Sequence, residues 1–216
     1  MKKLVVFDLD GTLLNTIADL AASTNQALAS FGFPTHPVDA YNYFVGNGIN
    51  KLFERALPEQ ARTEENIQKI RSSFVPYYDK HNTDLSKPYE GIPELLSALQ
   101  AEGIQLAVAS NKYQAATEKL IACYFPEIHF VSVLGQREGI PAKPDAGIVD
   151  DSMKRAGVCK AETLYVGDSN VDMQTAQNAG VDAAGVCWGF RPLSELEAYH
   201  PRYIARNPKD ILTFLG

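Results

Sequence analysis

The stretch Leu4-Val5-Val6-Phe7-Asp8-Leu9-Asp10-Gly11-Thr12 decides the fold of this chain. Its first four residues are apolar and partly β-branched, which predicts a fully buried strand of a parallel sheet. Two aspartates follow, one residue apart, and Gly11 lets the backbone turn sharply. The strand therefore delivers carboxylates to its carboxyl end, which is the edge of an open α/β sheet where ligands bind.

The two carboxylates of Asp8 and Asp10 indicate more than a turn. Strand alternation would point both side chains the same way, and two like charges in one cleft need a cation or a proton between them. Asp-Gly-Thr is also a common turn sequence, in which Asp10 would serve the turn alone. Because a turn does not account for a second aspartate directly after an apolar strand, we favour a functional role.

Composition excludes several classes of protein. The 216 residues suffice for one large domain or for a core with a sizeable insertion, and 45% hydrophobic with 21% charged residues is typical of soluble globular proteins. A net charge of −6 argues against binding to nucleic acid or to an anionic membrane. No segment approaches the ~20 apolar residues of a membrane span, and the first apolar run is too short for a signal peptide. Three cysteines lack metal-binding spacing, so we expect free thiols in a cytoplasmic protein: Cys123, Cys159 and Cys187.

The order of predicted elements indicates an α/β fold. A helix is expected over 16–30, with Asn15 as its N-cap, and residues 38–82 read as helical throughout. From Tyr89 onward helices alternate with strands, which predicts βα units and a parallel sheet with right-handed crossovers. These strands are expected at 105–109, 130–134, 163–166 and, as the last one, 183–186. The helical block therefore looks like an insertion just after the first strand.

Polar or charged side chains follow the predicted strands. Ser110-Asn111 ends the second strand, Lys143 follows the third, and Asp168 ends the fourth with Asp172 one helical turn further on. Each alone has an ordinary explanation as a helix cap, an exposed lysine or a residue that complements a helix dipole. Parallel strands, however, bring all these groups to one edge of the sheet.

Together with the first two aspartates, this set has a chemical logic. Carboxylates at positions 8, 10 and 168 are the hard oxygen ligands that Mg²⁺ takes alongside water and substrate phosphate. The hydroxyl and amide at 110 and 111 can donate hydrogen bonds to phosphate oxygens. Lys143 offers positive charge against the carboxylates and a transferring phosphoryl group.

These residues resemble the four motifs of the haloacid dehalogenase superfamily, in order and at suitable spacings. The motifs are Asp8-Leu9-Asp10-Gly11-Thr12-Leu13, Ser110-Asn111, Lys143-Pro144 and Gly167-Asp168-Ser169-x-x-Asp172. Further stretches are similar to the phosphoglycolate-phosphatase type: Val45-Gly46-Asn47-Gly48 with Glu54-Arg55-Ala56-Leu57, Pro88-Tyr89-x-Gly91-Ile92-Pro93, Ser110-Asn111-Lys112 and Gly185-Val186-x-Trp188-Gly189-Phe190. The resemblance covers essentially the whole chain. It implies a Rossmann-like parallel-sheet core, residues 1–15 and 86–216, with an inserted α-helical cap domain, residues 16–85.

The resemblance also implies roles for the carboxylates. Asp8 would be the nucleophile that forms an aspartyl-phosphate, a chemistry known for carboxylates in transport ATPases. Asp10 would protonate the leaving alkoxide and then deprotonate the hydrolytic water, with its backbone carbonyl on Mg²⁺. Asp168 would bind Mg²⁺, and Asp172 would support either the metal or Lys143.

The remaining motif residues would hold the phosphoryl group. Ser110 and Asn111 would bind it, and Lys143 would neutralise charge around the nucleophile. The chain departs from the family pattern at two positions, where Asn15 stands for a frequent Asp and Ala146 for a frequent Pro. The first change keeps a helix-capping residue, and the second affects only the path of a loop.

Cap residues are expected to set the substrate. The glycines Gly46 and Gly48 could form a flexible loop facing the cleft, with Lys51 or Arg55 reaching an anionic end of the substrate. Alternatively, Arg55 pairs with a glutamate at position 54 or 59 on the surface. Closure of the cap would exclude water before attack and admit it for hydrolysis.

Other activities fit less well. Dehalogenases need no acid–base aspartate two residues after the nucleophile, so Asp10 favours phosphoryl transfer. A β-phosphoglucomutase-like phosphomutase shares core and cap, but its cap phosphosugar signature is absent around 45–60, and a phosphonatase would need Lys51 as a Schiff base. A non-enzymatic phosphometabolite-binding module should have lost some of the motif residues. A dinucleotide site is disfavoured because Gly46-x-Gly48 follows a helix and not a strand.

We therefore expect a Mg²⁺-dependent phosphatase for a small phosphomonoester, with phosphoglycolate as the leading candidate and a pyrophosphatase or nucleotidase of the same superfamily as the alternative. Its partner would be a small phosphorylated metabolite, without nucleic acid or membrane. The protein is expected to be a monomer or a homodimer.

Overall fold

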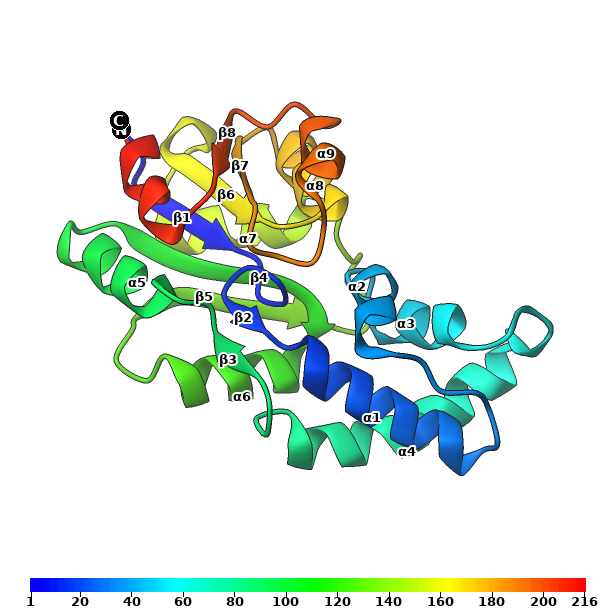
Figure 1. Ribbon diagram of the computed structural model, residues 1–216. Coiled ribbons are helices and arrows are strands. Elements are labelled where there is room, and N and C mark those ends of the chain that lie inside the picture. Colours follow the sequence, from blue (N-terminus) through cyan, green and yellow to red (C-terminus); the bar gives the residue numbers. More distant parts are fainter.

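The computed structural model describes residues 1–216 and has at its centre a six-stranded parallel sheet, in the order β5-β4-β1-β6-β7-β8 (Figure 1). Strand β1 (Leu4–Phe7) lies between β4 (Gln105–Tyr113) and β6 (Thr163–Gly167), with Phe7 level with Val108 and Val166. The outer strands are β5 (Phe130–Gln136), β7 (Asp182–Val186) and β8 (Tyr203–Ala205). The α/β fold predicted from the sequence is confirmed.

Helices cover both faces of the sheet because the central strand alternates between two apolar clusters. Val5 and Phe7 pack with α5 (Ile92–Ala101), α6 (Gln114–Tyr124) and the C-terminal 3₁₀ segment Pro208–Phe214. Leu4 and Val6 pack on the opposite side with three helices, α7 (Gly147–Ala156), α8 (Asn170–Ala179) and α9 (Leu193–Glu197). The whole of β1 is buried, as its continuous apolar run predicts.

The helical block has its own core. It contains α1 (Ile17–Ser30), α2 (Tyr41–Phe44), α3 (Ile49–Ala56) and α4 (Glu64–His81), with short 3₁₀ segments at Val38–Ala40 and Glu59–Ala61. Large apolar side chains of these helices form a separate cluster, in which Phe74 contacts both Phe53 and Tyr78. In Figure 1 these helices lie beyond the carboxyl ends of the sheet strands. The block is therefore placed over the edge where the motif residues gather.

A two-stranded antiparallel pair joins the block to the sheet. Strand β2 (Leu14–Asn15) leads into α1, and β3 (Lys87–Pro88) returns from α4; Asn15 pairs with Lys87. The predicted division near residues 15 and 86 falls at this pair. None of the helices in the structure is both long and apolar enough to cross a bilayer.

Some predicted details were wrong. Strand β4 continues to Tyr113 because pairing with β5 resumes at Gln136 after an irregularity, so the Ser110-Asn111 step lies within the strand. The expected last strand is followed by β8, a three-residue strand that pairs with β7. Asn15 is not the N-cap of α1, because that position belongs to Thr16. The Thr16 hydroxyl makes no cap bond but donates instead to a carboxylate of the first motif.

Asp19 ties the start of α1 to the segment that returns to the sheet. Its buried carboxylate accepts hydrogen bonds from the backbone N–H groups of Leu85 (3.0 Å) and Ser86 (2.8 Å) and from the Ser86 hydroxyl (2.6 Å). Removing this acceptor leaves the N–H and hydroxyl groups of the buried Ser86 without a partner, which costs about 1–3 kcal/mol.

We expect Asp19→Ala to lower the free energy of unfolding in urea by about 1–3 kcal/mol. Asp39→Ala is the matched control, because Asp39 is an exposed acidic residue of the same helical block. Equal unfolding midpoints for the two variants would show that the Asp19 contacts do not stabilise the junction.

Candidate active site

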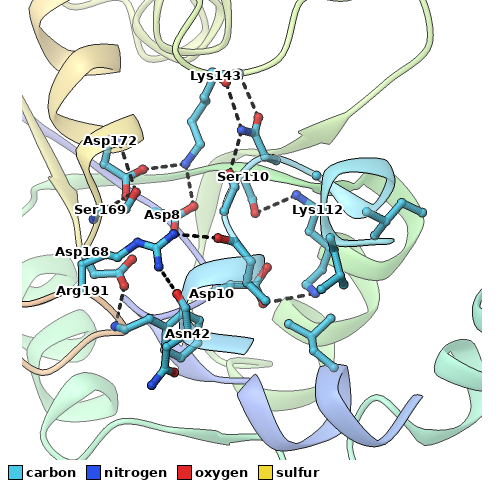
Figure 2. A pocket seen from close by; sticks show the side chains of 18 residues that line it. Asp8, Asp10, Asn42, Ser110, Lys112, Lys143, Asp168, Ser169, Asp172 and Arg191 are labelled. Atoms are coloured by element: carbon cyan, nitrogen blue, oxygen red, sulfur yellow. Dashed lines mark hydrogen bonds and ion pairs between the residues drawn. The ribbon is translucent and has the colours of Figure 1, made fainter. Parts of the chain in front are cut away.

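The carboxyl ends of the three central strands converge on one pocket (Figure 2). Asp8 follows β1, Ser110 and Asn111 lie in β4, and Asp168 follows β6. The level register of these strands places the side chains at the same edge of the sheet. Residues of the helical block, including Val45, Gly46, Gly48 and Leu52, line the opposite wall of a cavity of about 40 Å³.

Lys143 connects two buried carboxylates at the bottom of the pocket. Its Nζ lies 2.6 Å from Oδ1 of Asp8 and 2.7 Å from Oδ1 of Asp172, and it donates to the hydroxyl of Tyr165 at 3.0 Å. Burial on its own lowers the pKa of Lys143, but the carboxylates of Asp172 and Asp8 outweigh it and raise the pKa well above its usual value. The ammonium therefore stays charged beside the predicted nucleophile.

Asp8 carries the clearest electrostatic signature. Burial raises the pKa of Asp8 to about 7, against the lowering effect of Lys143 and with additional raising effects from Asp172 and Asp10. Burial likewise raises the pKa of Asp168 well above its ordinary value, again with Asp172 and Asp8 adding to the effect. The three clustered carboxylates of Asp8, Asp168 and Asp172 thus hold more negative charge than Lys143 offsets.

The carboxylates of Asp8, Asp168 and Asp172 fit a metal ion. Each offers an oxygen within 4.8 Å of the others, and all three residues are buried. These are hard oxygen donors with surplus negative charge, as a divalent cation of the Mg²⁺ type requires. The Asp172 carboxylate already binds Lys143 through Oδ1 and accepts from Ser169 N–H and Oγ through Oδ2.

The Asp168 carboxylate is held by hydrogen bonds and packs against Gly11, where a side chain would not fit. The N–H of Phe190 donates to its Oδ2 at 2.7 Å, and the hydroxyl of Thr12 lies 3.4 Å from its Oδ1. Gly11 has φ +91°, and a Cβ atom there would lie 2.3 Å from Oδ2 of Asp168. The Asp-Gly step of the first motif therefore serves both the turn and the close approach of the distant aspartate.

Asn111 lines the pocket and binds two neighbouring segments. Its Oδ1 accepts from the backbone N–H of Lys143 at 2.8 Å, and its Nδ2 donates to the carbonyls of Lys143 (3.1 Å) and Gly46 (3.0 Å). Its amide thus holds the Lys143 loop and the glycine loop of the helical block. Ser110 Oγ accepts from the Lys112 N–H at 3.1 Å.

The Asp10 side chain points away from the cluster formed by Asp8, Asp168 and Asp172. Its Oδ1 accepts from Thr16 Oγ1 at 2.5 Å and pairs with Lys112 Nζ at 3.1 Å. Its carboxylate is not among the three that could share an ion. Thr16 and Lys112 were missed from the sequence as partners of this aspartate, although Lys112 directly follows the second motif.

The predicted cap residues differ in their positions. Gly48 lines the pocket, whereas Lys51 is exposed, pairs with Glu54 at 2.6 Å and lies along an outer cleft of about 570 Å³. Arg55 reaches neither the pocket nor a glutamate; it donates to the carbonyl of Phe44 (3.0 Å) and to Oδ1 of Asn47 (2.7 Å). One contact satisfies the last carbonyl of the short helix α2 and the other a side chain of the segment that follows, so Arg55 shapes the glycine loop.

Arg191 is a pocket residue that the sequence analysis missed. It lies two residues after the Trp188-Gly189 step and donates to the carbonyl of Asn42 and, at 3.1 Å, to that of Val45 (Figure 2). The arginine therefore links the loop after β7 to the helical block across the pocket. In the sequence, only the position of Arg191 close to Gly189 could have indicated that it lines the pocket.

Comparisons with known proteins agree with this geometry. The family described as haloacid dehalogenase-like hydrolase matches residues 5–186. The chain is 32% identical to phosphoglycolate phosphatase of Mannheimia succiniciproducens over 97% of this chain and 96% of the relative, and 34% identical to that of Agrobacterium fabrum over 91% and 86%. A crystal structure of a predicted phosphoglycolate phosphatase from Haemophilus somnus superposes with a TM-score of 0.92 at 30% identity, covering 100% of this chain and 98% of the other. The resemblance identified from the motifs is confirmed: the chain belongs to the haloacid dehalogenase-like hydrolase family.

Proposed function

We propose that this protein is a Mg²⁺-dependent phosphomonoester hydrolase that acts on a small phosphorylated metabolite, with 2-phosphoglycolate as the leading substrate. One observation carries the proposal: Asp8 is buried, bound to Lys143 and within reach of Asp168 at the edge of the sheet. The names of the relatives and the small volume of the pocket support this substrate.

Asp8 and Asp168 would hold the ion, together with the backbone carbonyl of Asp10. When bound, the ion supplies positive charge that offsets the carboxylates and the phosphate oxygens. The two Asp172 oxygens are engaged by Lys143 and Ser169, so we assign Asp172 to positioning Lys143. Lys143 would remain beside the phosphoryl group as a fixed positive charge.

Catalysis would proceed in two displacements. In the first, an Asp8 oxygen forms a bond to phosphorus while the bond to the leaving oxygen breaks, and Asp10 gives that oxygen a proton. In the second, a water oxygen bonds to phosphorus, the Asp8–phosphorus bond breaks, and the proton of the water passes to Asp10. The Ser110 hydroxyl would donate a hydrogen bond to a phosphoryl oxygen. Asn111 would hold the surrounding loops in place.

The helical block would act as a cap that selects the leaving group. Its glycine loop contacts Asn111 and Arg191 and lies on one wall of the pocket of about 40 Å³. A narrow pocket favours a short leaving group such as glycolate over a sugar or a nucleoside. Lys51, at the outer cleft, would attract anionic substrates without contacting the phosphoryl group.

A phosphate-release panel tests this function. We expect 2-phosphoglycolate to give a higher kcat/KM than sugar phosphates, nucleotides, pyrophosphate and phosphonoacetaldehyde. Chelation should abolish turnover, and added Mg²⁺ should restore it. A clear preference for pyrophosphate or a nucleotide would contradict the assigned substrate, and full activity in chelator would contradict the metal requirement.

A further inference from the structure

Lys112 is a buried lysine for which the two displacements above provide no role. Its side chain is 3% exposed, and its Nζ lies 3.1 Å from Oδ1 of Asp10 and 2.8 Å from the hydroxyl of Tyr78. Figure 2 shows the side chain reaching Asp10 from the strand that carries the second motif. The ammonium also lies 4.8 Å from the centre of the Tyr78 ring.

The charge of Lys112 requires the carboxylate of Asp10. A buried ammonium is costly unless it is paired and hydrogen-bonded, and Asp10 is the one carboxylate with which Lys112 forms an ion pair. Thr16 donates to the same oxygen at 2.5 Å, from the start of α1. Two donors on two different elements therefore fix Oδ1, and neither of them contacts Oδ2.

The other partner of Lys112 belongs to the helical block. Tyr78 lies in α4, is fully buried and stacks on Phe74 with ring centres 5.0 Å apart. The lysine consequently links Asp10 on the sheet side to the core of the cap. Its geometry depends on the cap being seated on the sheet.

We propose that Lys112 is a positioning residue that holds Oδ1 of Asp10, so that Oδ2 faces the reacting oxygen when the cap is in place. The inference rests on the proposed function, because it assumes that Asp8 is the nucleophile and Asp10 the acid and base. Lys112 itself does not touch the substrate. Loss of its ammonium leaves Asp10 misoriented in both displacements.

A substrate with a good leaving group separates the two displacements. p-Nitrophenolate leaves as an anion and needs no proton, so Asp10 matters little for forming the aspartyl-phosphate. Hydrolysis of that intermediate still needs a base to take the proton of water. A misplaced Asp10 therefore makes the phosphoenzyme accumulate, which appears as a burst of p-nitrophenol.

We expect Lys112→Met to lower the steady-state kcat for p-nitrophenyl phosphate by about 10²-fold while leaving a burst of about one equivalent per enzyme. Turnover of 2-phosphoglycolate should fall further, because its alkoxide needs the proton in the first displacement as well. Asp10→Asn is the reference and should give the same pattern. Lys119→Met is the control, since Lys119 also contacts the cap, through Asn82 at 2.9 Å, but does not reach Asp10.

Tyr78→Phe provides a second test that keeps the ion pair and removes only the hydroxyl. We expect a smaller fall in kcat with the same burst, and this variant decides the matter if Lys112→Met does not fold. If Asp10→Asn shows a burst and a folded Lys112→Met shows none, the positioning role is wrong. If Lys112→Met does not fold, a burst in Asp10→Asn with none in Tyr78→Phe overturns it instead. An active Asp10→Asn without a burst would instead overturn the proposed function.

Discussion

Asp8→Asn should reduce turnover of every phosphomonoester by about 10⁴-fold or more, a loss of the size that follows removal of an enzymatic nucleophile. The amide has nearly the shape of the carboxylate and can still accept from Lys143, so the fold should survive. What it lacks is the anionic oxygen that attacks phosphorus. Phosphate release under saturating Mg²⁺ measures the effect, and a variant retaining most of the wild-type rate would exclude Asp8 as the nucleophile.

The same substitution should stabilise the metal-free protein at alkaline pH. Burial raises the pKa of Asp8 from 3.8 to about 7, so across this range the unfolded chain gives up the proton more readily than the folded one. The ionisation of Asp8 therefore costs the wild type stability as the pH rises from about 4 to about 7, and Asp8→Asn is free of this contribution. In chelator, the variant should unfold at a higher temperature than the wild type at pH 8, and the difference should shrink towards pH 4. An equal difference at both values would contradict the raised pKa.

Lys143→Met should be the most destabilising change at the site. It leaves the buried carboxylates of Asp8 and Asp172 without their ammonium, and breaking a buried pair in this way costs about 3–5 kcal/mol. Turnover should also fall by several orders of magnitude, because the fixed positive charge beside the phosphoryl group is lost. Urea unfolding without metal measures the first effect, and phosphate release the second.

A matched control and a double variant make this prediction specific. Lys154→Met removes an exposed lysine in the last turn of α7 and should leave stability nearly unchanged. Combining Lys143→Met with Asp8→Asn should recover more stability than Asp8→Asn adds to the wild type, since the charge that is removed is one that the loss of the lysine leaves uncompensated. A double variant whose stability equals the sum of the two single effects would show that the two side chains are not coupled.

The sequence predicts the sheet-edge part of the site well because parallel strands leave little freedom there. Asp8 and Asp168 follow central strands that pair in level register, so the sequence positions alone bring them together. Lys143 reaches them from a loop, and its predicted place beside Asp8 agrees with the 2.6 Å contact.

Contacts between the sheet and the helical block could not be predicted in the same way. The partners of Lys112 and Arg191 depend on how α2 and α4 are seated, and no periodicity in the sequence specifies that placement. Strands β2, β3 and β8 were missed because two or three residues carry no alternation that could be recognised. The partner of Arg55 could not be predicted for the same reason. An arginine on a helix can bind a substrate, a glutamate or a backbone carbonyl, and in the structure the position of the α2 carbonyl decides between them.

Rapid-quench trapping of the phosphoenzyme tests the central claim most directly. Wild-type enzyme is mixed with substrate and Mg²⁺, and the reaction is stopped in acid within the first turnover. The protein is then digested, and the peptide carrying a phosphoryl group is identified by mass spectrometry. We predict an acid-stable, hydroxylamine-sensitive phosphoryl group on Asp8, with none on Asp8→Asn. Phosphate on another residue, or turnover with no phosphoenzyme even in Asp10→Asn, would contradict it.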